Sequence, residues 1–195
     1  MSRLNGEQIK ILLFPNNEVK ISEFRHLIRV DGDNVFEFQF RDNTSLLVLL
    51  IVAEILLELG AKCRLKIDYM PYSRMDHDIE GDIQTLPYIC RMINRYDCFT
   101  EVTVVEPHSD RTLELLDKSK AFFPVPTWLS EIKAQIGFNE ETDHIVFPDK
   151  NAAKRYENYG FKNVIVFDKE RDTSDEGKGR IIRFSNLIAK NRVKI

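Results

Sequence analysis

Short apolar runs along the chain alternate with longer segments in which apolar positions recur at helical spacing. Residues 35–40 alternate apolar and polar positions with period two, which predicts a half-buried strand. Residues 46–59 form a long apolar run that follows the capping residues 42–45 and stops at Gly60, which predicts a helix. The same patterns predict further strands at 9–14, 63–69, 101–105, 144–147 and 163–167, and further helices at 85–96, 110–118, 129–136 and 150–159.

This order of strands separated by helices predicts an α/β fold made of right-handed βαβ units on a parallel sheet. The polar stretch 137–143 interrupts the series and predicts a boundary between a domain at 1–142 and a second domain at 143–195. Residues 168–180 are charged and contain glycine, so a mobile loop is predicted there.

The composition excludes several classes of protein. The 195 residues are 43% hydrophobic and 30% charged, which is enough apolar material for a buried core. The formal net charge of −3 argues against a dedicated nucleic-acid binder, whose surface would be basic. The longest apolar stretch, 46–57, contains Glu54 and is shorter than the roughly 20 residues that span a bilayer. We therefore expect neither nucleic acid nor membrane as a partner.

The cysteines and the first residues predict a cytoplasmic protein. Cys63, Cys90 and Cys98 are odd in number and match no metal-binding spacing, which is typical of reduced thiols. Residues 1–10 are mostly polar and do not form a secretory signal.

Four segments that follow predicted strands carry candidate chemistry, because ligands bind beyond the carboxyl ends of the strands in open α/β sheets. The first, at 70–77, holds Arg74, Asp76 and His77. The planar guanidinium of an arginine suits a phosphate group. The alternative is a solvated loop with an ion pair between Arg74 and Asp76.

The second segment, at 106–110, places His108 beside Ser109 and Asp110. This group suits a magnesium nucleotide, since Mg²⁺ takes oxygen ligands and His108 can contact a phosphate. The alternative is a helix start that Ser109 or Asp110 caps.

The third and fourth segments are shorter. Asp149 follows the predicted strand 144–147, where it could hold a metal or a sugar hydroxyl, or cap the next helix. Lys169 and Arg171 open the predicted loop 168–180 and could clamp a transferring phosphoryl group. The alternative for this pair is a solvated charged loop.

Several common motifs are missing from the sequence. It contains no GxxxxGK[ST], no GxGxxG after a strand, no GxSxG and no paired CxxC. A P-loop kinase, a Rossmann dehydrogenase and an α/β-hydrolase are therefore not the first interpretations.

Taken in order, the candidate segments resemble the phosphoribosyl-pyrophosphate synthetases, or ribose-phosphate diphosphokinases. Residues 71–77 are similar to the family's Pro-Tyr-x-Arg-Gln-Asp-Arg, and residues 106–110 to its Asp-Pro-His-Ser-Asp. Residues 147–151 resemble its Ser-Pro-Asp-Ala-Gly, and residues 169–171 its Lys-x-Arg. An early Asp-Gly-Glu turn is similar to residues 31–33, so that the resemblance covers nearly the whole chain.

The resemblance implies a transferase that uses Mg²⁺ to move the β,γ-diphosphate of ATP to the 1-hydroxyl of ribose 5-phosphate. The product is phosphoribosyl pyrophosphate for nucleotide and NAD synthesis. It also implies two tandem phosphoribosyltransferase-type domains in a homo-oligomer, in which the turn at 31–33 reaches a neighbouring subunit's adenine. The implied ATP-binding residues are Asp31, Asp33, Arg74, Met75, Asp76 and His77; the implied metal contacts are His108 and Asp149; the implied catalytic residues are Lys169 and Arg171.

The sequence also departs from the family's pattern. Met75 replaces a glutamine, His77 an arginine, and Lys150-Asn151 a small Ala-Gly pair. The Asp-Asp-x-x-x-Thr-x-Gly-Thr loop that cradles ribose 5-phosphate is absent, and it would follow a strand that begins near residue 193. We therefore expect a chain truncated inside its second domain, whose activity by itself is in doubt.

These departures leave alternatives open. The altered residues suit a relative that takes a larger ribosyl phosphate such as ADP-ribose. The absent loop suits a non-catalytic nucleotide-binding or regulatory subunit. A phosphoribosyltransferase is disfavoured, because the absent loop is the one that such an enzyme most needs.

Overall fold

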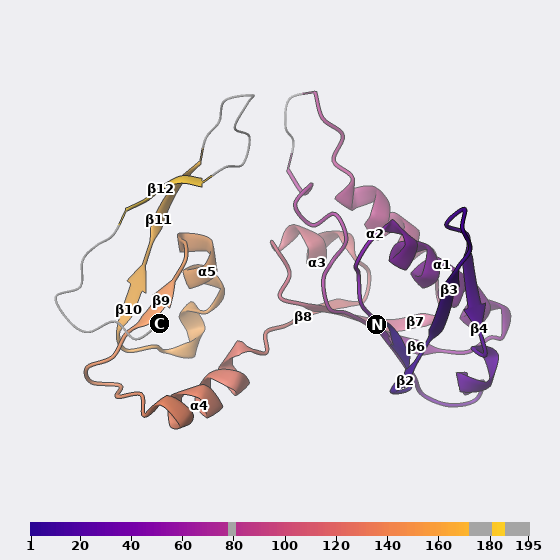
Figure 1. Cartoon of the computed structure of the whole chain (residues 1–195), viewed down its shortest axis with the longest axis horizontal. Coiled ribbons are helices and arrows are strands. Elements are labelled where there is room, and N and C mark those ends of the chain that lie inside the picture. The colour runs from indigo at the N-terminus through magenta and orange to yellow at the C-terminus, as the bar shows by residue number, and fades with distance from the viewer. Residues whose placement is uncertain (78–80, 172–180, 186–195) are drawn as a thin grey trace. The chain divides into compact units, whose positions relative to one another are not determined.

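The computed structural model describes residues 1–77, 81–171 and 181–185, with the backbone alone for 168–171 and 181–185. The chain divides into two compact units, Met1–Pro124 and Val125–Ile195 (Figure 1). The domain boundary predicted at 142/143 from the sequence pattern stays a prediction. No helix in the described ranges has the length and apolarity needed to cross a membrane.

The first unit is built on a six-stranded sheet with the order β2-β1-β5-β6-β7-β8. Strands β5 to β8 are parallel, and β1 and β2 extend the sheet in antiparallel pairing. The bounds are β1 Arg3–Leu4, β2 Glu7–Gln8, β5 Asn34–Phe38, β6 Cys63–Ile67, β7 Phe99–Val105 and β8 Ser119–Phe122. The predicted α/β class with a mostly parallel sheet is confirmed.

Three helices, α1 (Asn43–Glu58), α2 (Leu86–Asn94) and α3 (Arg111–Leu115), connect successive parallel strands. Each connection moves to the next strand in the same direction, so right-handed crossovers place all three helices on one face of the sheet. Alternate strand residues on that face are buried and form the core with the helices: Phe36, Phe38, Leu65, Ile67, Val102 and Val104.

The ends of α1 follow the sequence closely. The Asp42 carboxylate accepts a hydrogen bond from the Ser45 backbone N–H at 2.9 Å, which caps the first turn. Gly60 follows the helix with φ of +66°, a conformation that glycine adopts without strain. The predicted start and stop signals of this helix are confirmed.

The opposite face of the sheet is polar. Lys66 pairs with Glu37 on the neighbouring strand at 3.6 Å, and Lys120 pairs with Glu101 at 2.7 Å. The parallel strands therefore bury one face, and their alternating sequence reflects this.

The apolar run 9–14 does not join the central sheet. Its residues form β3 (Lys10–Leu13), which pairs only with β4 (Val19–Ser22) in an antiparallel hairpin, ahead of the short 3₁₀ helix η1 (Arg25–Leu27). The strand predicted at 9–14 is confirmed as β3, which lies in this hairpin and not in the parallel sheet. A turn closes the hairpin through the Phe14 N–H, which donates to the Glu18 carbonyl at 2.9 Å, and this local pairing competes with the sheet.

The second unit contains two small sheets. Strands β9 (Ile145–Phe147) and β10 (Val164–Val166) are parallel and are joined by α5 (Lys150–Arg155) and the 3₁₀ helix η2 (Glu157–Tyr159). Strands β11 (Asp168–Arg171) and β12 (Ile181–Ser185) pair antiparallel. The loop predicted at 168–180 was wrong for residues 168–171, which form β11. The charged composition did not prevent a strand there, because β11 pairs through its backbone. Residues 172–180 lie outside the described residues.

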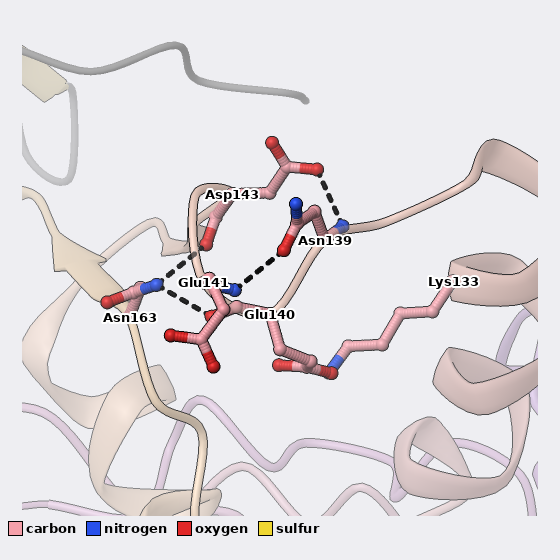
Figure 2. A network of polar contacts seen from close by, with 6 residues as sticks. All are labelled: Lys133, Asn139, Glu140, Glu141, Asp143 and Asn163. Carbon is pink, nitrogen blue, oxygen red and sulfur yellow. Dashed lines mark hydrogen bonds and ion pairs between the residues drawn. The ribbon is translucent and has the colours of Figure 1, made fainter.

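The polar stretch 137–143 follows α4 (Val125–Ile136) and is anchored by a network of hydrogen bonds (Figure 2). The carboxylate of buried Asp143 accepts from the Asn139 N–H at 2.9 Å. The Asn163 amide donates to the carbonyls of Glu140 at 2.9 Å and Asp143 at 3.3 Å. Lys133 on α4 pairs with Glu140 at 2.5 Å. These contacts tie α4 to the start of β10.

The three cysteines are free and buried. Burial raises the pKa of the Cys63 and Cys90 thiols to about 12. Thiols with such values are poor nucleophiles near neutral pH, so the cysteines belong to the core and not to a site.

Asn34 holds the amino end of the sheet together. Its buried side chain donates to the carbonyls of Arg29 at 2.8 Å and Lys62 at 2.9 Å, and accepts from the Arg29 N–H at 3.0 Å and the Asn5 amide at 3.0 Å. It also donates to the Gly32 carbonyl at 3.2 Å. One amide thus fixes the turn at 31–33 and ties it to the start of β6.

We predict that Asn34→Ala lowers the free energy of unfolding by about 2–4 kcal/mol, because several buried backbone groups lose their partner. Urea unfolding followed by circular dichroism measures this. Asn16→Ala is the matched control: Asn16 is exposed and accepts one 3.2 Å hydrogen bond, so a change within about 0.5 kcal/mol is expected. Equal effects of the two substitutions would contradict this role of Asn34.

Candidate functional site

The candidate site lies at the carboxyl edge of the parallel sheet, where the loops after β6 and β7 meet. Each loop contains a residue with positive φ: Tyr72 at +58°, five residues after β6, and Glu106 at +47°, directly after β7. Such values are uncommon outside glycine and cluster at functional sites. The Glu106 N–H donates to the Phe122 carbonyl at the end of β8 at 3.0 Å, which holds the turn in place.

Asp76 joins the two loops. Its side chain is 4% exposed, and each of its carboxylate oxygens has a separate partner. The Ser109 hydroxyl, in the loop after β7, donates to Oδ2, and His77 Nδ1 lies 2.6 Å from Oδ1. The predicted segments 70–77 and 106–110 are therefore in direct contact through this one carboxylate.

The electrostatics of Asp76 follow from these contacts. Burial by itself raises the pKa of a carboxyl group, but the hydrogen bonds from Ser109 and His77 outweigh burial and hold the Asp76 pKa below its ordinary value of 3.8. The carboxylate is therefore charged at neutral pH, although it is buried. A buried charge of this kind fixes the geometry of its partners, because moving either of them leaves the charge without compensation.

The loop after β5 is attached to the same edge. The Tyr72 hydroxyl donates to Asn43 Oδ1, at the first residue of α1, at 2.7 Å. The rings of Phe40 and Tyr69 stack with centroids 6.2 Å apart and an interplanar angle of 19°. Three successive strands thus carry loops that contact one another at their carboxyl ends.

The structure places the other predicted residues of segment 70–77 around this centre. Arg74 and His77 are exposed, and 78% of the His77 side chain is accessible. Met75 is half-buried, and its N–H donates to the Tyr72 carbonyl at 2.9 Å. His108 is exposed in the neighbouring loop, next to Ser109. Arg74, His77 and His108 are therefore exposed to solvent at this edge.

Asp31 and Asp33 lie elsewhere in the unit. Both are exposed in the turn before β5, at the amino edge of the sheet. The strand rise of about 3.3 Å per residue places the two ends of five-residue β5 about 13 Å apart. Within one chain, these carboxylates are therefore not part of the Asp76 centre.

The remaining predicted residues belong to the second unit. Asp149 caps α5, where its Oδ1 accepts from the Ala152 N–H at 2.8 Å, so the capping alternative holds for this oxygen. Lys169 and Arg171 lie on β11, opposite Phe184 and Ile181. Their side chains lie outside the described part of the chain.

The donor groups at this edge decide which kind of metal site it could form. Across the described residues, no three His, Cys, Asp or Glu side chains gather into a group that could hold a metal ion. Mg²⁺ in nucleotide enzymes is bound largely by substrate phosphates and one or two protein groups. The residues at this edge fit a metal that arrives on a nucleotide and not a metal in a cage of protein ligands.

Two contacts of this centre could not be predicted from the sequence. Ser109 entered as a member of a motif, but its link to Asp76 depends on residues 33 positions apart. Tyr72 likewise entered only as part of a motif, and its hydrogen bond to Asn43 has no local signal in the sequence. The order of strands and helices predicts the edge of the sheet at which Ser109 and Tyr72 lie. It does not predict the residues with which they form hydrogen bonds.

No protein-family model and no curated protein matches the sequence. Among solved structures, the chain is similar to the crystal structure of a phosphoribosylpyrophosphate synthetase from Mycobacterium smegmatis, with a TM-score of 0.65 and 16% sequence identity. The match covers 85% of this chain and 57% of that protein, so the chain spans less than two thirds of its structural neighbour. The similarity shows a fold of the phosphoribosyltransferase type.

We predict that the stability of the protein depends on the ionisation of Asp76. Because the pKa of Asp76 is lower in the folded protein than in the unfolded chain, ionisation of this carboxyl group stabilises the fold. The stabilisation is complete well above pH 3.8 and is lost as the pH falls through the lowered pKa. The difference in free energy of unfolding between the wild type and Asp76→Asn should therefore be largest near neutral pH and shrink on acidification. Urea unfolding at a series of pH values measures it; a difference that does not change with pH would contradict the prediction.

Proposed function

We propose that this chain forms the nucleotide-binding part of a ribose-phosphate diphosphokinase. The reaction would be the ATP- and Mg-dependent transfer of diphosphate to the 1-hydroxyl of ribose 5-phosphate. The contact between Asp76 and Ser109 carries the proposal, because it joins the segment that resembles the family's ATP-binding motif to the segment that resembles its metal-contact motif, at the edge where such sheets bind ligands. The similarity in fold to a phosphoribosylpyrophosphate synthetase supports it.

In this proposal the exposed and the buried residues of the edge have different roles. Arg74 binds the phosphates of ATP through its guanidinium, with Met75 and His77 beside it. Asp76 is a positioning residue, since both of its oxygens already accept hydrogen bonds from the protein. This revises the direct ATP contact that the resemblance implies for Asp76.

Asp31 and Asp33 would complete the adenine end of the site from a second copy of the chain. Their position at the amino edge of the sheet supports this, because they are too far from Arg74 along the strand direction to share one nucleotide within a protomer. The proposal therefore includes a homo-oligomer.

Mg²⁺ would arrive bound to the phosphates of ATP, with His108 as a contact from the loop after β7. Asp149 is the proposed contact from the second unit, in addition to its capping of α5. When bound, the metal would neutralise charge on the phosphates.

Lys169 and Arg171 are the proposed catalytic residues. In the transfer, the sugar 1-hydroxyl oxygen bonds to the β-phosphorus and releases its proton to solvent, the bond from this phosphorus to the bridging oxygen of the α-phosphate breaks, and AMP leaves. The side chains of Lys169 and Arg171 would stabilise the negative charge on the transferring diphosphate. Positioning and charge supply most of the catalysis in phosphoryl transfer.

A second candidate function is a non-catalytic, nucleotide-binding subunit. One observation favours it: the contact between Asp76 and Ser109, with exposed Arg74 and His108 beside it, is formed entirely within the first unit. A larger acceptor such as ADP-ribose is the remaining alternative, for which Met75, His77, Lys150 and Asn151 are the altered positions.

The first test is ATP binding. We predict that Arg74→Ala weakens MgATP binding by roughly ten- to a hundredfold, because a charge-assisted hydrogen bond contributes about 1.5–3 kcal/mol. Arg64→Ala is the matched control: Arg64 is also exposed, but it lies near the start of β6, whereas Arg74 follows the end of that strand. Isothermal titration calorimetry on the full chain measures both. A loss no greater in Arg74→Ala than in Arg64→Ala would overturn the assignment of the site.

The same samples then separate the two candidate functions. Incubation with MgATP and ribose 5-phosphate, followed by measurement of AMP, reports the transfer. AMP release that depends on the sugar would support the enzyme, and its loss in Lys169→Ala would support the role of that lysine. ATP binding without AMP release would support the nucleotide-binding subunit. Absence of both would contradict the two functions.

A further inference from the structure

The buried carboxylate of Asp76 fixes the tautomer of His77. Nδ1 of His77 lies 2.6 Å from Asp76 Oδ1, and the Ser109 hydroxyl occupies the other oxygen. Asp76 is ionised at neutral pH and can therefore only accept hydrogen bonds, so the proton between the two groups belongs to Nδ1. The neutral form of His77 is thus held as the tautomer that carries its hydrogen on Nδ1.

The second ring nitrogen, Nε2, is the one that a ligand can reach. The His77 side chain is 78% accessible, whereas that of Asp76 is 4% accessible. In the neutral tautomer, Nε2 carries a lone pair and cannot donate a hydrogen bond. Once the ring is protonated, Nε2 becomes a donor and the ring gains a positive charge. An anion therefore gains a charged hydrogen bond from His77 only in the protonated form.

The charged groups around His77 come from two loops. Asp76 contacts the ring directly, and exposed Arg74 lies on the same loop after β6. His108 and Asp110 are exposed in the loop after β7, on either side of Ser109. A phosphate at this edge therefore meets a permanent charge on Arg74 and a charge on His77 that depends on pH.

The residue type at position 77 gives this arrangement its consequence. The sequence resemblance places an arginine where His77 stands, and a guanidinium stays charged throughout the physiological pH range. An imidazole loses its proton near neutral pH. The replacement therefore converts a permanent charge at this position into a titratable one.

We propose that His77 binds a phosphate of ATP through Nε2 in its protonated form only, so that the affinity for MgATP falls as the pH rises through neutrality. The inference rests on the proposed function and adds a dependence on pH to its nucleotide site. Arg74 supplies the charge that remains at higher pH. When His77 is neutral in the free chain, the nucleotide binds together with one proton taken up from solvent.

Calorimetric titration of MgATP into the full chain at about pH 6 and about pH 8 tests the inference, because an imidazole titrates within this range. His77→Arg is the reference, since it keeps a permanent charge at this position. The titration of ATP itself affects all chains equally, so comparison with the reference removes it. We expect the wild-type affinity to fall about tenfold more than that of His77→Arg between the two pH values.

His77→Asn keeps a donor for Asp76 but has no titratable group. It should bind MgATP more weakly than the wild type at the lower pH and show the pH dependence of His77→Arg. His26→Asn is the matched control: His26 is an exposed histidine of η1 outside the candidate site, so this variant should keep the wild-type pH dependence. Thermal unfolding confirms that each variant is folded, and if His77→Arg does not fold, the comparison of His77→Asn with His26→Asn decides.

Two results would overturn this inference and leave the proposed function intact. One is an equal pH dependence in the wild type and in His77→Asn. The other is a pH dependence that His108→Asn abolishes and His77→Asn keeps. Absence of MgATP binding by the wild type at both pH values would instead contradict the proposed function itself, and the inference with it.

Discussion

The hydrogen bond between Ser109 and the buried carboxylate of Asp76 is the interaction on which the candidate site depends. It joins the loops after two neighbouring parallel strands, and Asp76 also holds His77. Burial of a carboxylate costs free energy unless hydrogen bonds compensate its charge. The folded loops therefore need both Ser109 and His77 beside Asp76. Because both oxygens of Asp76 have partners within the protein, the exposed groups beside it, Arg74 and His108, are the ones free to meet a ligand.

The parallel sheet then decides which residues can act together. Its carboxyl edge gathers the loops after β5, β6 and β7, and its amino edge holds the turn with Asp31 and Asp33 that Asn34 fixes. In the proposed function, a second copy of the chain supplies Asp31 and Asp33 to the ATP site, because these residues lie at the edge of the sheet opposite Arg74. The second unit, with β9 and β10, carries the strand with Lys169 and Arg171.

Much of the fold could be predicted from the sequence. The period-two pattern gave β5, the long apolar run between Asp42 and Gly60 gave α1, and the alternation of elements gave the parallel sheet. The two-residue strands β1 and β2 are too short for a periodic signal, and the apolar run that forms β3 carries no indication that its partner is β4 in the same hairpin. The candidate segments were found from strand ends and resemblance. The hydrogen bond between Asp76 and Ser109 that connects these segments could not be predicted, since it joins residues far apart in sequence.

The most direct test of the account is a double-mutant cycle on MgATP affinity with Asp76→Asn, Ser109→Ala and the double variant, measured by calorimetry on folded protein. If the hydrogen bond organises the nucleotide site, each single substitution weakens binding and the double variant is little worse than either, with a coupling energy of about 0.5–3 kcal/mol. Strictly additive losses, or unchanged affinity in all three variants, would show that the two loops bind nucleotide independently of this contact, and would contradict the account.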